Sequence, residues 1–207
     1  MKSENKWISW AKELQNLSQC ALAYCNDKYD IERFKRIREI SAEMISEISD
    51  QQLDEIKATF CAGTGYQTPK MDTRSAVIRE GRILLVQEAD GKWALPGGWI
   101  DYDQTIRSNA MKEVLEEAGM VVEPLRVIAL YDHNRRNHTV FPGNICSVYV
   151  LCRYISGSFQ LNLETVNAAF FAADELPESL AEEKTTKEQI QMCFQAAANE
   201  NWKVIFD

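Results

Sequence analysis

The sequence predicts an α+β protein in which a mixed β-sheet is sandwiched between helices and is preceded by a small all-α domain. The chain has 207 residues, which suits one large domain or two small ones. Apolar residues recur every three or four positions up to about residue 60, and they alternate in short runs after residue 70. These runs lie on both sides of one central helical segment, and another helical segment follows them, as expected for a sheet covered on its faces.

The first domain is assigned to residues 1–66. Its apolar residues follow a helical period in three segments, at 5–25, 31–48 and 53–60. Gly63, Gly65 and Pro69 then break the period, so residues 61–70 are interpreted as a linker. Short amphipathic helices must bury their apolar faces, either against the second domain or against another subunit.

The second domain is assigned to residues 67–207 and begins with two β-like runs around Glu80 and Gly81, a pair typical of a hairpin turn. Six runs in this domain have the composition of strands, at 74–78, 82–87, 93–95, 127–131, 145–154 and 168–172. Two helices are expected among and after them, at 106–118 and 186–199.

Both helices carry terminal signals. Thr105 precedes the first helix as its N-cap, and Gly119 follows it as the residue that ends it. Thr185 and Glu188 match a capping box at the start of the second helix.

Composition excludes several classes of protein. The hydrophobic fraction is 45% and the net charge is −8, which argues against nucleic-acid binding through bulk charge. The longest apolar stretch, 146–152, is far shorter than the ~18 residues of a membrane helix, and the charged first residues do not resemble a signal peptide. The six cysteines form no CxxC motif, so we expect reduced thiols in a cytoplasmic protein.

The most informative residues are Glu113, Glu116 and Glu117. The spacing i, i+3, i+4 places these three carboxylates on one helix face, where like charges repel. A divalent cation such as Mg²⁺ or Mn²⁺ would relieve that repulsion, whereas the alternative is an ordinary solvated acidic face. Gly97 and Gly98 lie upstream of the helix, and such a pair lets backbone approach a ligand closely.

The surrounding residues resemble the box motif of the Nudix hydrolases, G-x5-E-x7-R-E-U-x-E-E-x-G-U, in which U is apolar. The matching stretch is Gly98-x5-Gln104-x7-Lys112-Glu113-Val114-x-Glu116-Glu117-x-Gly119-Met120. Residues 72–178 as a whole resemble a Nudix domain. The N-terminal helices are similar to the extension of a subfamily that hydrolyses nucleoside diphosphates linked to another moiety, such as ADP-ribose or CDP-choline.

Two positions depart from the motif. Gln104 stands where the family has Glu, and Lys112 stands where it has Arg. The resemblance implies that these two residues join the loop to the helix. They could keep a hydrogen bond but would lose a bidentate ion pair. The three glutamates are retained, so we expect a working enzyme.

The resemblance also implies a mechanism in which water attacks a phosphoanhydride with the help of Mg²⁺ or Mn²⁺. Glu113, Glu116 and Glu117 would hold the metal together with the carbonyl of Gly97. Family members recruit a further glutamate from a later loop as ligand or base, and Glu164 occupies that place here; its alternative role is that of an ordinary loop carboxylate.

Substrate contacts are expected from a polar, basic loop at 132–138, with His133, Arg135 and Arg136 as the candidates, unless that loop is simply solvated. Trp99 could stack on a base or pack the loop. The expected partner is a nucleoside diphosphate derivative, and the resemblance favours a homodimer. Two other functions stay open, a non-catalytic nucleotide sensor and a pyrophosphohydrolase that sanitises nucleoside triphosphates.

Overall fold

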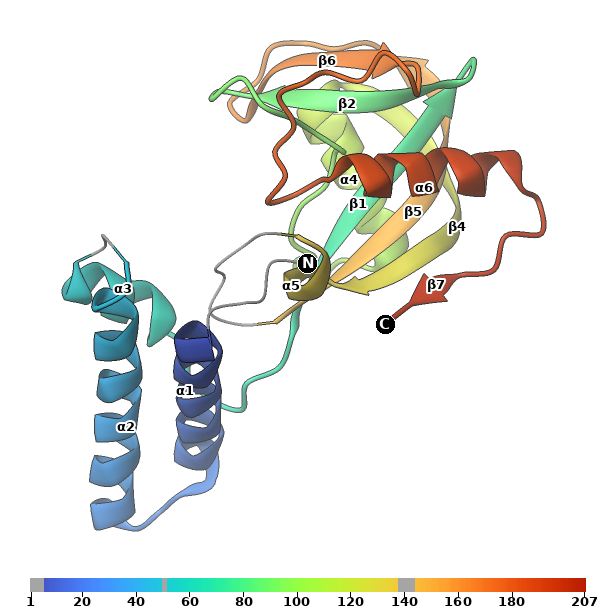
Figure 1. The fold of residues 1–207 in the computed structure, drawn as a ribbon. Coiled ribbons are helices and arrows are strands. Elements are labelled where there is room, and N and C mark those ends of the chain that lie inside the picture. The colour runs from blue at the N-terminus through green and yellow to red at the C-terminus, as the bar shows by residue number, and fades with distance from the viewer. Residues whose placement is uncertain (1–5, 50–51, 138–143) are drawn as a thin grey trace. The chain divides into compact units, whose positions relative to one another are not determined.

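The computed structural model describes residues 6–49, 52–137 and 144–207, and it divides the chain into two compact units (Figure 1). Of the described residues, the first unit contains 6–49, 52–69 and Asn144, and the second contains 70–137 and 145–207. The division therefore falls three residues after the boundary expected at residue 66. Lys70 belongs to the second unit because its backbone is already in register with Ile145 of a neighbouring strand.

The first unit contains three helices, α1 (Lys6–Tyr24), α2 (Lys28–Ser46) and α3 (Leu53–Phe60). Helix α2 begins three residues earlier than expected because the side chain of Asp27 accepts hydrogen bonds from the backbone N–H groups of Tyr29 and Asp30. The helices enclose a small apolar core made of Ala11, Ala42, Ile45, Ile56 and Phe60.

The second unit is a mixed sheet whose strands are β1 (Lys70–Arg79), β2 (Arg82–Glu88), β3 (Trp93–Ala94), β4 (Met120–Asp132), β5 (Ile145–Gly157), β6 (Thr165–Phe171) and β7 (Ile205–Phe206). The strand order is β3-β2-β1-β5-β4-β7, and β6 pairs with β2 outside this path. Strand β1 is parallel to β5, whereas β1 and β2, and β4 and β5, are antiparallel.

Helices α4 (Ile106–Ala118) and α6 (Lys187–Ala198) cover opposite faces of this sheet (Figure 1). Ala110, Val114 and Ala118 of α4 pack with Val77 and Val148 on one face. On the other face, Ile190 and Cys193 of α6 pack with strand residues that alternate with the first set, among them Ala76 and Tyr149. The predicted class, a mixed sheet sandwiched between helices after an all-α region, is confirmed.

Several predicted details are wrong. The capping box of α6 is made by Thr186 and Gln189, because the hydroxyl of the buried Thr185 instead accepts a hydrogen bond from the backbone of Leu95. Strand β4 begins at Met120 rather than residue 127, since irregularities in its pairing accommodate Pro124 within the strand. The short helix α5 (His133–Arg136) and strand β7 were not predicted.

No helix in the described part of the chain is long and apolar enough to span a membrane.

Candidate active site

Helix α4 presents the three glutamates because both of its ends are defined by the sequence. Thr105 and Ser108 form a reciprocal capping box at its start. At its end Gly119 adopts a left-handed conformation, with φ 66°, and its N–H bonds to the carbonyl of Leu115. The helix therefore keeps the register that sets Glu113, Glu116 and Glu117 along one face, as predicted.

Glu117 is held by the glycine loop. Its Oε2 accepts a hydrogen bond of 2.9 Å from the backbone N–H of Gly97. Burial raises the pKa of Glu117 to about 8; the Gly97 N–H and the charge of Arg74 offset part of that rise, whereas Glu113 and Glu164 add to it. The groups around Glu117 do not fully compensate its negative charge, so a bound cation or a bound proton would stabilise it.

Glu113 is buried, with 7% of its surface exposed, and packs directly against Gly98. A Cβ atom at position 98 would lie 2.6 Å from Glu113 Oε2, so any side chain there would displace the carboxylate. Burial raises the pKa of Glu113, and the charges of Glu116 and Glu164 raise it further. The glycine therefore leaves the space that this carboxylate occupies.

Lys112 neutralises two of these carboxylates. Its Nζ lies 3.4 Å from Glu113 Oε1 and 3.2 Å from Glu116 Oε2, and it also lies 3.2 Å from Asp101 Oδ2 in the loop before the helix. Burial lowers the pKa of Lys112, but the hydrogen bonds to Glu116 and Asp101 outweigh it and raise that pKa overall. The expected hydrogen bond to Gln104 is wrong, because the Gln104 amide donates to Asp103 and the loop is tied to Lys112 through Asp101.

The loop that carries Glu164 is fastened to the end of α4. The side chains of Asn162 and Thr165 both donate to the backbone carbonyl of Glu117, over 3.2 Å and 2.6 Å. Glu164 itself is exposed, and its charge raises the pKa values of both Glu113 and Glu117. The structure therefore brings Glu164 close to the carboxylates of the helix.

These carboxylates are not closed into a metal cage. Among the described residues, no three His, Cys, Asp or Glu side chains converge tightly enough to hold an ion. The donor set nevertheless suits a hard divalent cation, since the carboxylates of Glu113 and Glu117 both lie against the glycine loop, at Gly98 and at Gly97. In this structure the ammonium group of Lys112 supplies the positive charge beside Glu113 and Glu116.

The predicted substrate residues separate into two groups. His133 is buried, its Nε2 donates to the carbonyl of Glu183 over 2.8 Å, and its Nδ1 lies 3.1 Å from the hydroxyl of Ser147. Both ring nitrogens are thus used inside the protein, and burial lowers the pKa of His133. Arg136 bonds to Asp207 and stacks on Tyr131. These contacts give both side chains partners within the protein, and their role in substrate binding stays a prediction.

Arg135 and Trp99 keep exposed surface. Arg135 pairs with Asp132 over 3.2 Å while 75% of its side chain faces solvent. The backbone of Trp99 forms an isolated antiparallel β-bridge with Asp72 of β1. The centre of its ring lies 5.2 Å from the Lys70 Nζ, and the residue remains 45% exposed. Neither side chain is consumed by the core, so both stay candidates. Position 138 of the predicted basic loop lies outside the described residues.

Sequence reasoning missed two residues beside the glycine loop, Asp72 and Arg74. Both are buried on β1, and Arg74 donates to Asp72 and to the carbonyl of Gly97. The available signal was a charged pair at i, i+2 within a strand of otherwise apolar and small residues.

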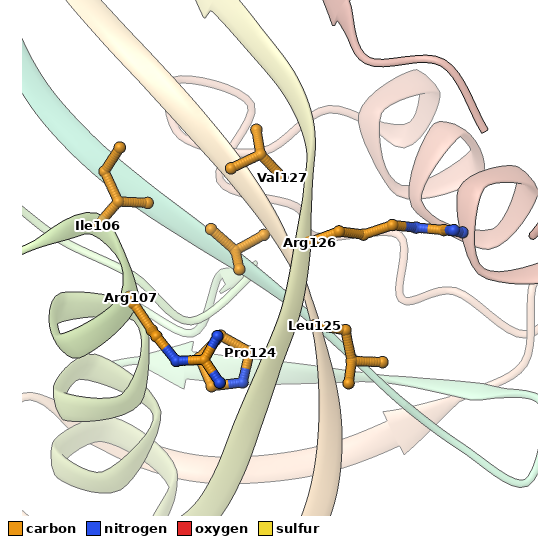
Figure 2. A pocket seen from close by; sticks show the side chains of 7 residues that line it. Ile106, Arg107, Pro124, Leu125, Arg126 and Val127 are labelled. Carbon is orange, nitrogen blue, oxygen red and sulfur yellow. The ribbon is translucent and has the colours of Figure 1, made fainter. Parts of the chain in front are cut away.

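A separate pocket of about 200 Å³ lies between the start of α4 and strand β4 (Figure 2). None of the predicted site residues lines it, and Arg126 extends away from it toward α6. The pocket is therefore distinct from the carboxylate site. Its lining residues are Ile106, Arg107, Pro124, Leu125, Arg126, Val127 and Val150.

With this geometry in hand, comparison with known proteins identifies the class. The family model of the NUDIX domain matches residues 69–192, and the model described as "UDP-X-like, N-terminal oligomerisation domain" matches residues 5–60. The first match covers more than half of the chain, so the protein belongs to the Nudix family and is a Nudix hydrolase.

One curated relative and one solved structure span nearly the whole chain. A Bacillus subtilis (strain 168) protein named "Putative ADP-ribose pyrophosphatase YjhB" is 35% identical over 208 residues, which cover 100% of both chains. The crystal structure of an ADP-ribose pyrophosphatase from Streptococcus suis 89-1591 is 48% identical, with a TM-score of 0.63, and covers 68% of this chain and 100% of its own. A UDP-X diphosphatase structure is 28% identical, has a TM-score of 0.63 and covers 97% of this chain and 98% of its own.

Proposed function

We propose that this Nudix hydrolase cleaves the pyrophosphate bond of a nucleoside diphosphate linked to another moiety, with a divalent cation as cofactor. One observation carries the proposal: Glu117, hydrogen-bonded to Gly97, lies on the same helix face as Glu113 and Glu116, and the loop of Glu164 is fastened to the end of that helix. Such a concentration of carboxylates favours a hard cation over any other ligand. The products would be a nucleoside monophosphate and a phosphorylated second moiety.

In this proposal Glu116 and Glu117 hold the ion, with Glu113 and the carbonyl of Gly97 as further ligands. When bound, Mg²⁺ or Mn²⁺ would neutralise the diphosphate and orient the attacking water. Glu164 is exposed on a loop anchored to α4, which suits a base that reaches water from the solvent side. Lys112 balances Glu113 and Glu116 in the absence of the ion.

ADP-ribose is the first substrate to test, because two relatives similar to this chain are named ADP-ribose pyrophosphatases. UDP-linked compounds follow from the likeness to a UDP-X diphosphatase. CDP-choline stays a candidate from the sequence resemblance alone. Arg135 and Trp99 are the side chains proposed to contact the diphosphate and the base.

The test is a substrate panel with Mg²⁺ or Mn²⁺, containing ADP-ribose, a UDP-sugar, CDP-choline, NADH, a dinucleoside polyphosphate and dNTPs. We expect nucleoside monophosphate to form from one linked diphosphate, to disappear with EDTA, and to fall at least about 10³-fold in Glu117→Gln. Glu188→Gln, an exposed glutamate on α6, is the matched control and should retain full turnover.

Turnover that persists in Glu117→Gln would overturn the role of that residue. Tight binding of a nucleotide without turnover across the metal series would instead indicate a sensor. Preferential hydrolysis of dNTPs would indicate the sanitising function.

We also propose that the protein is a homodimer assembled through its helical domain of residues 1–66, since a family model described as an oligomerisation domain matches residues 5–60. A cytoplasmic location is consistent with the six free cysteines and stays a prediction.

A further inference from the structure

A buried ion pair on β1 contacts the glycine loop from the sheet side. Arg74 Nε and Nη2 donate to the same Asp72 oxygen, over 3.0 Å and 2.7 Å. The two side chains are 9% and 3% exposed. They lie two residues apart on one strand and therefore face the same side of the sheet, the side covered by α6.

The third guanidinium nitrogen reaches the loop itself. Arg74 Nη1 donates to the carbonyl oxygen of Gly97 over 3.2 Å. The N–H of the same glycine donates to Glu117 on α4, which covers the other side of the sheet. Gly97 is thus held between Arg74 and Glu117, the second of which is proposed to bind the metal.

The rest of the loop is fixed by β1 through other atoms. The N–H of Ser75 donates to Pro96, and the N–H of Thr73 donates to Gly98. Gly97 has φ 152°, and a Cβ there would lie 1.8 Å from the carbonyl oxygen of Thr73, so its backbone packs tightly on the strand. The backbone bonds from β1 orient the carbonyls of Pro96 and Gly98, and the guanidinium of Arg74 orients the carbonyl of Gly97 between them.

Stability alone explains the ion pair poorly. A buried pair is often matched or exceeded in stability by apolar residues of similar volume, because desolvation offsets the attraction. This pair also leaves Asp72 Oδ1 and the nearby Tyr149 hydroxyl buried without a hydrogen-bond partner in the described part of the chain. Polar atoms kept at such a site suggest a use other than packing.

We propose that Arg74, anchored by Asp72, is a positioning residue that fixes the Gly97 peptide in the orientation the cation site requires. The inference rests on the proposed function, because it assumes that the Gly97 carbonyl and Glu117 serve that site. Groups that orient metal ligands typically change metal affinity by about 10–100-fold when removed.

The experiment measures Mn²⁺ binding by electron paramagnetic resonance on the full chain without substrate. Arg74→Lys keeps a positive charge that can pair with Asp72, but it lacks the planar fork whose separate nitrogens reach Asp72 and the Gly97 carbonyl together. We expect its Mn²⁺ affinity to fall about 10-fold while the protein stays folded by circular dichroism. Arg74→Met should lose about 100-fold. Arg126→Met, a change at another partly buried arginine remote from the glycine loop, should bind Mn²⁺ like the parent chain.

An Mn²⁺ affinity equal to that of the parent chain in folded Arg74→Lys overturns the inference. If KM for the substrate rises at the same time, Arg74 is a substrate contact instead. Glu117→Gln is the reference for the proposed function. If Glu117→Gln also binds Mn²⁺ normally, the metal site itself is wrong; if only Glu117→Gln fails, the site stands and the role of Arg74 does not.

Discussion

At the scale of single residues, the glutamates of the site differ in whether a positively charged side chain lies beside them. Lys112 replaces the family's arginine and meets Glu113, Glu116 and Asp101 as one point charge, so the loop-to-helix link survives with Asp101 in place of Gln104. Within the described part of the chain, Glu117 forms no ion pair, and its carboxylate accepts one hydrogen bond, from the backbone N–H of Gly97. This difference explains why burial raises the pKa of Glu117 to about 8.

The first prediction concerns that pKa. In the fold it lies at about 8, above the ordinary value of 4.5, so the metal-free native state binds a proton that the unfolded chain releases. This contribution to stability is full below pH 4.5 and is lost as the pH rises to about 8. Thermal unfolding in EDTA should show the parent chain losing about 2–4 kcal/mol more than Glu117→Gln between pH 5 and pH 9.

Saturating Mg²⁺ should reduce that loss, because the ion favours the charged carboxylate. Parallel pH curves for the parent chain and Glu117→Gln in EDTA would contradict the prediction.

At the scale of elements, the two helices on the sheet are secured in different ways. Helix α4 carries its own signals, Thr105 at the start and Gly119 at the end. Helix α6 begins with a capping box, but one carbonyl of its last turn and two carbonyls just after it are bound by a residue of a distant strand. Arg126 of β4 donates to the carbonyls of Ala196, Asn199 and Glu200 over 2.7–2.8 Å. A cation at this end also interacts favourably with the helix dipole.

We therefore predict that Arg126→Met lowers the free energy of unfolding by about 2–3 kcal/mol, since three carbonyls lose a charged donor. Arg153→Met on the neighbouring strand is the matched control. The Arg153 side chain is 63% exposed, and Glu123 is its one ion-pair partner among the described residues. Its removal should therefore change the free energy of unfolding by less than about 1 kcal/mol. Urea denaturation of both variants measures the difference, and equal losses would refute the assignment.

At the scale of the whole molecule, the first unit is too small to bury all of its large apolar side chains. Among the described residues its apolar core contains five buried side chains, whereas several large side chains of α1 stay exposed, with Trp7 57%, Leu17 61% and Tyr24 74% exposed. Apolar side chains that gather on one element in this way are typical of a surface that meets a partner. The match to a family model for oligomerisation supports the same interpretation.

Leu17→Glu should therefore convert a particle of twice the chain mass of 23.7 kDa into a monomer, because a charge would be buried in the contact. Light scattering coupled to size exclusion measures the mass. Lys35→Glu on the exposed side of α2 also changes the charge and should leave the mass unchanged. A doubled mass in both variants would place the contact elsewhere.

The amino-acid sequence by itself determined the class of fold, the position of most helices and strands, and the alignment of three glutamates on α4. These features follow from local periods and from the spacing of a single 23-residue motif, which need no knowledge of distant contacts. Thr105 and Gly119 belong to the same level, because caps act on neighbouring backbone.

Only the tertiary structure decided which polar residues lie together around the glycine loop and the end of α4. It gave His133 two hydrogen-bond partners inside the protein and paired Lys112 with Asp101. It also fastened the loop of Glu164 to the end of α4 and brought Arg74 to Gly97, 23 positions along the chain. These contacts join strands, loops and helix ends that are remote in sequence. A side chain's partner there is set by sheet register and packing, which residue spacing does not encode.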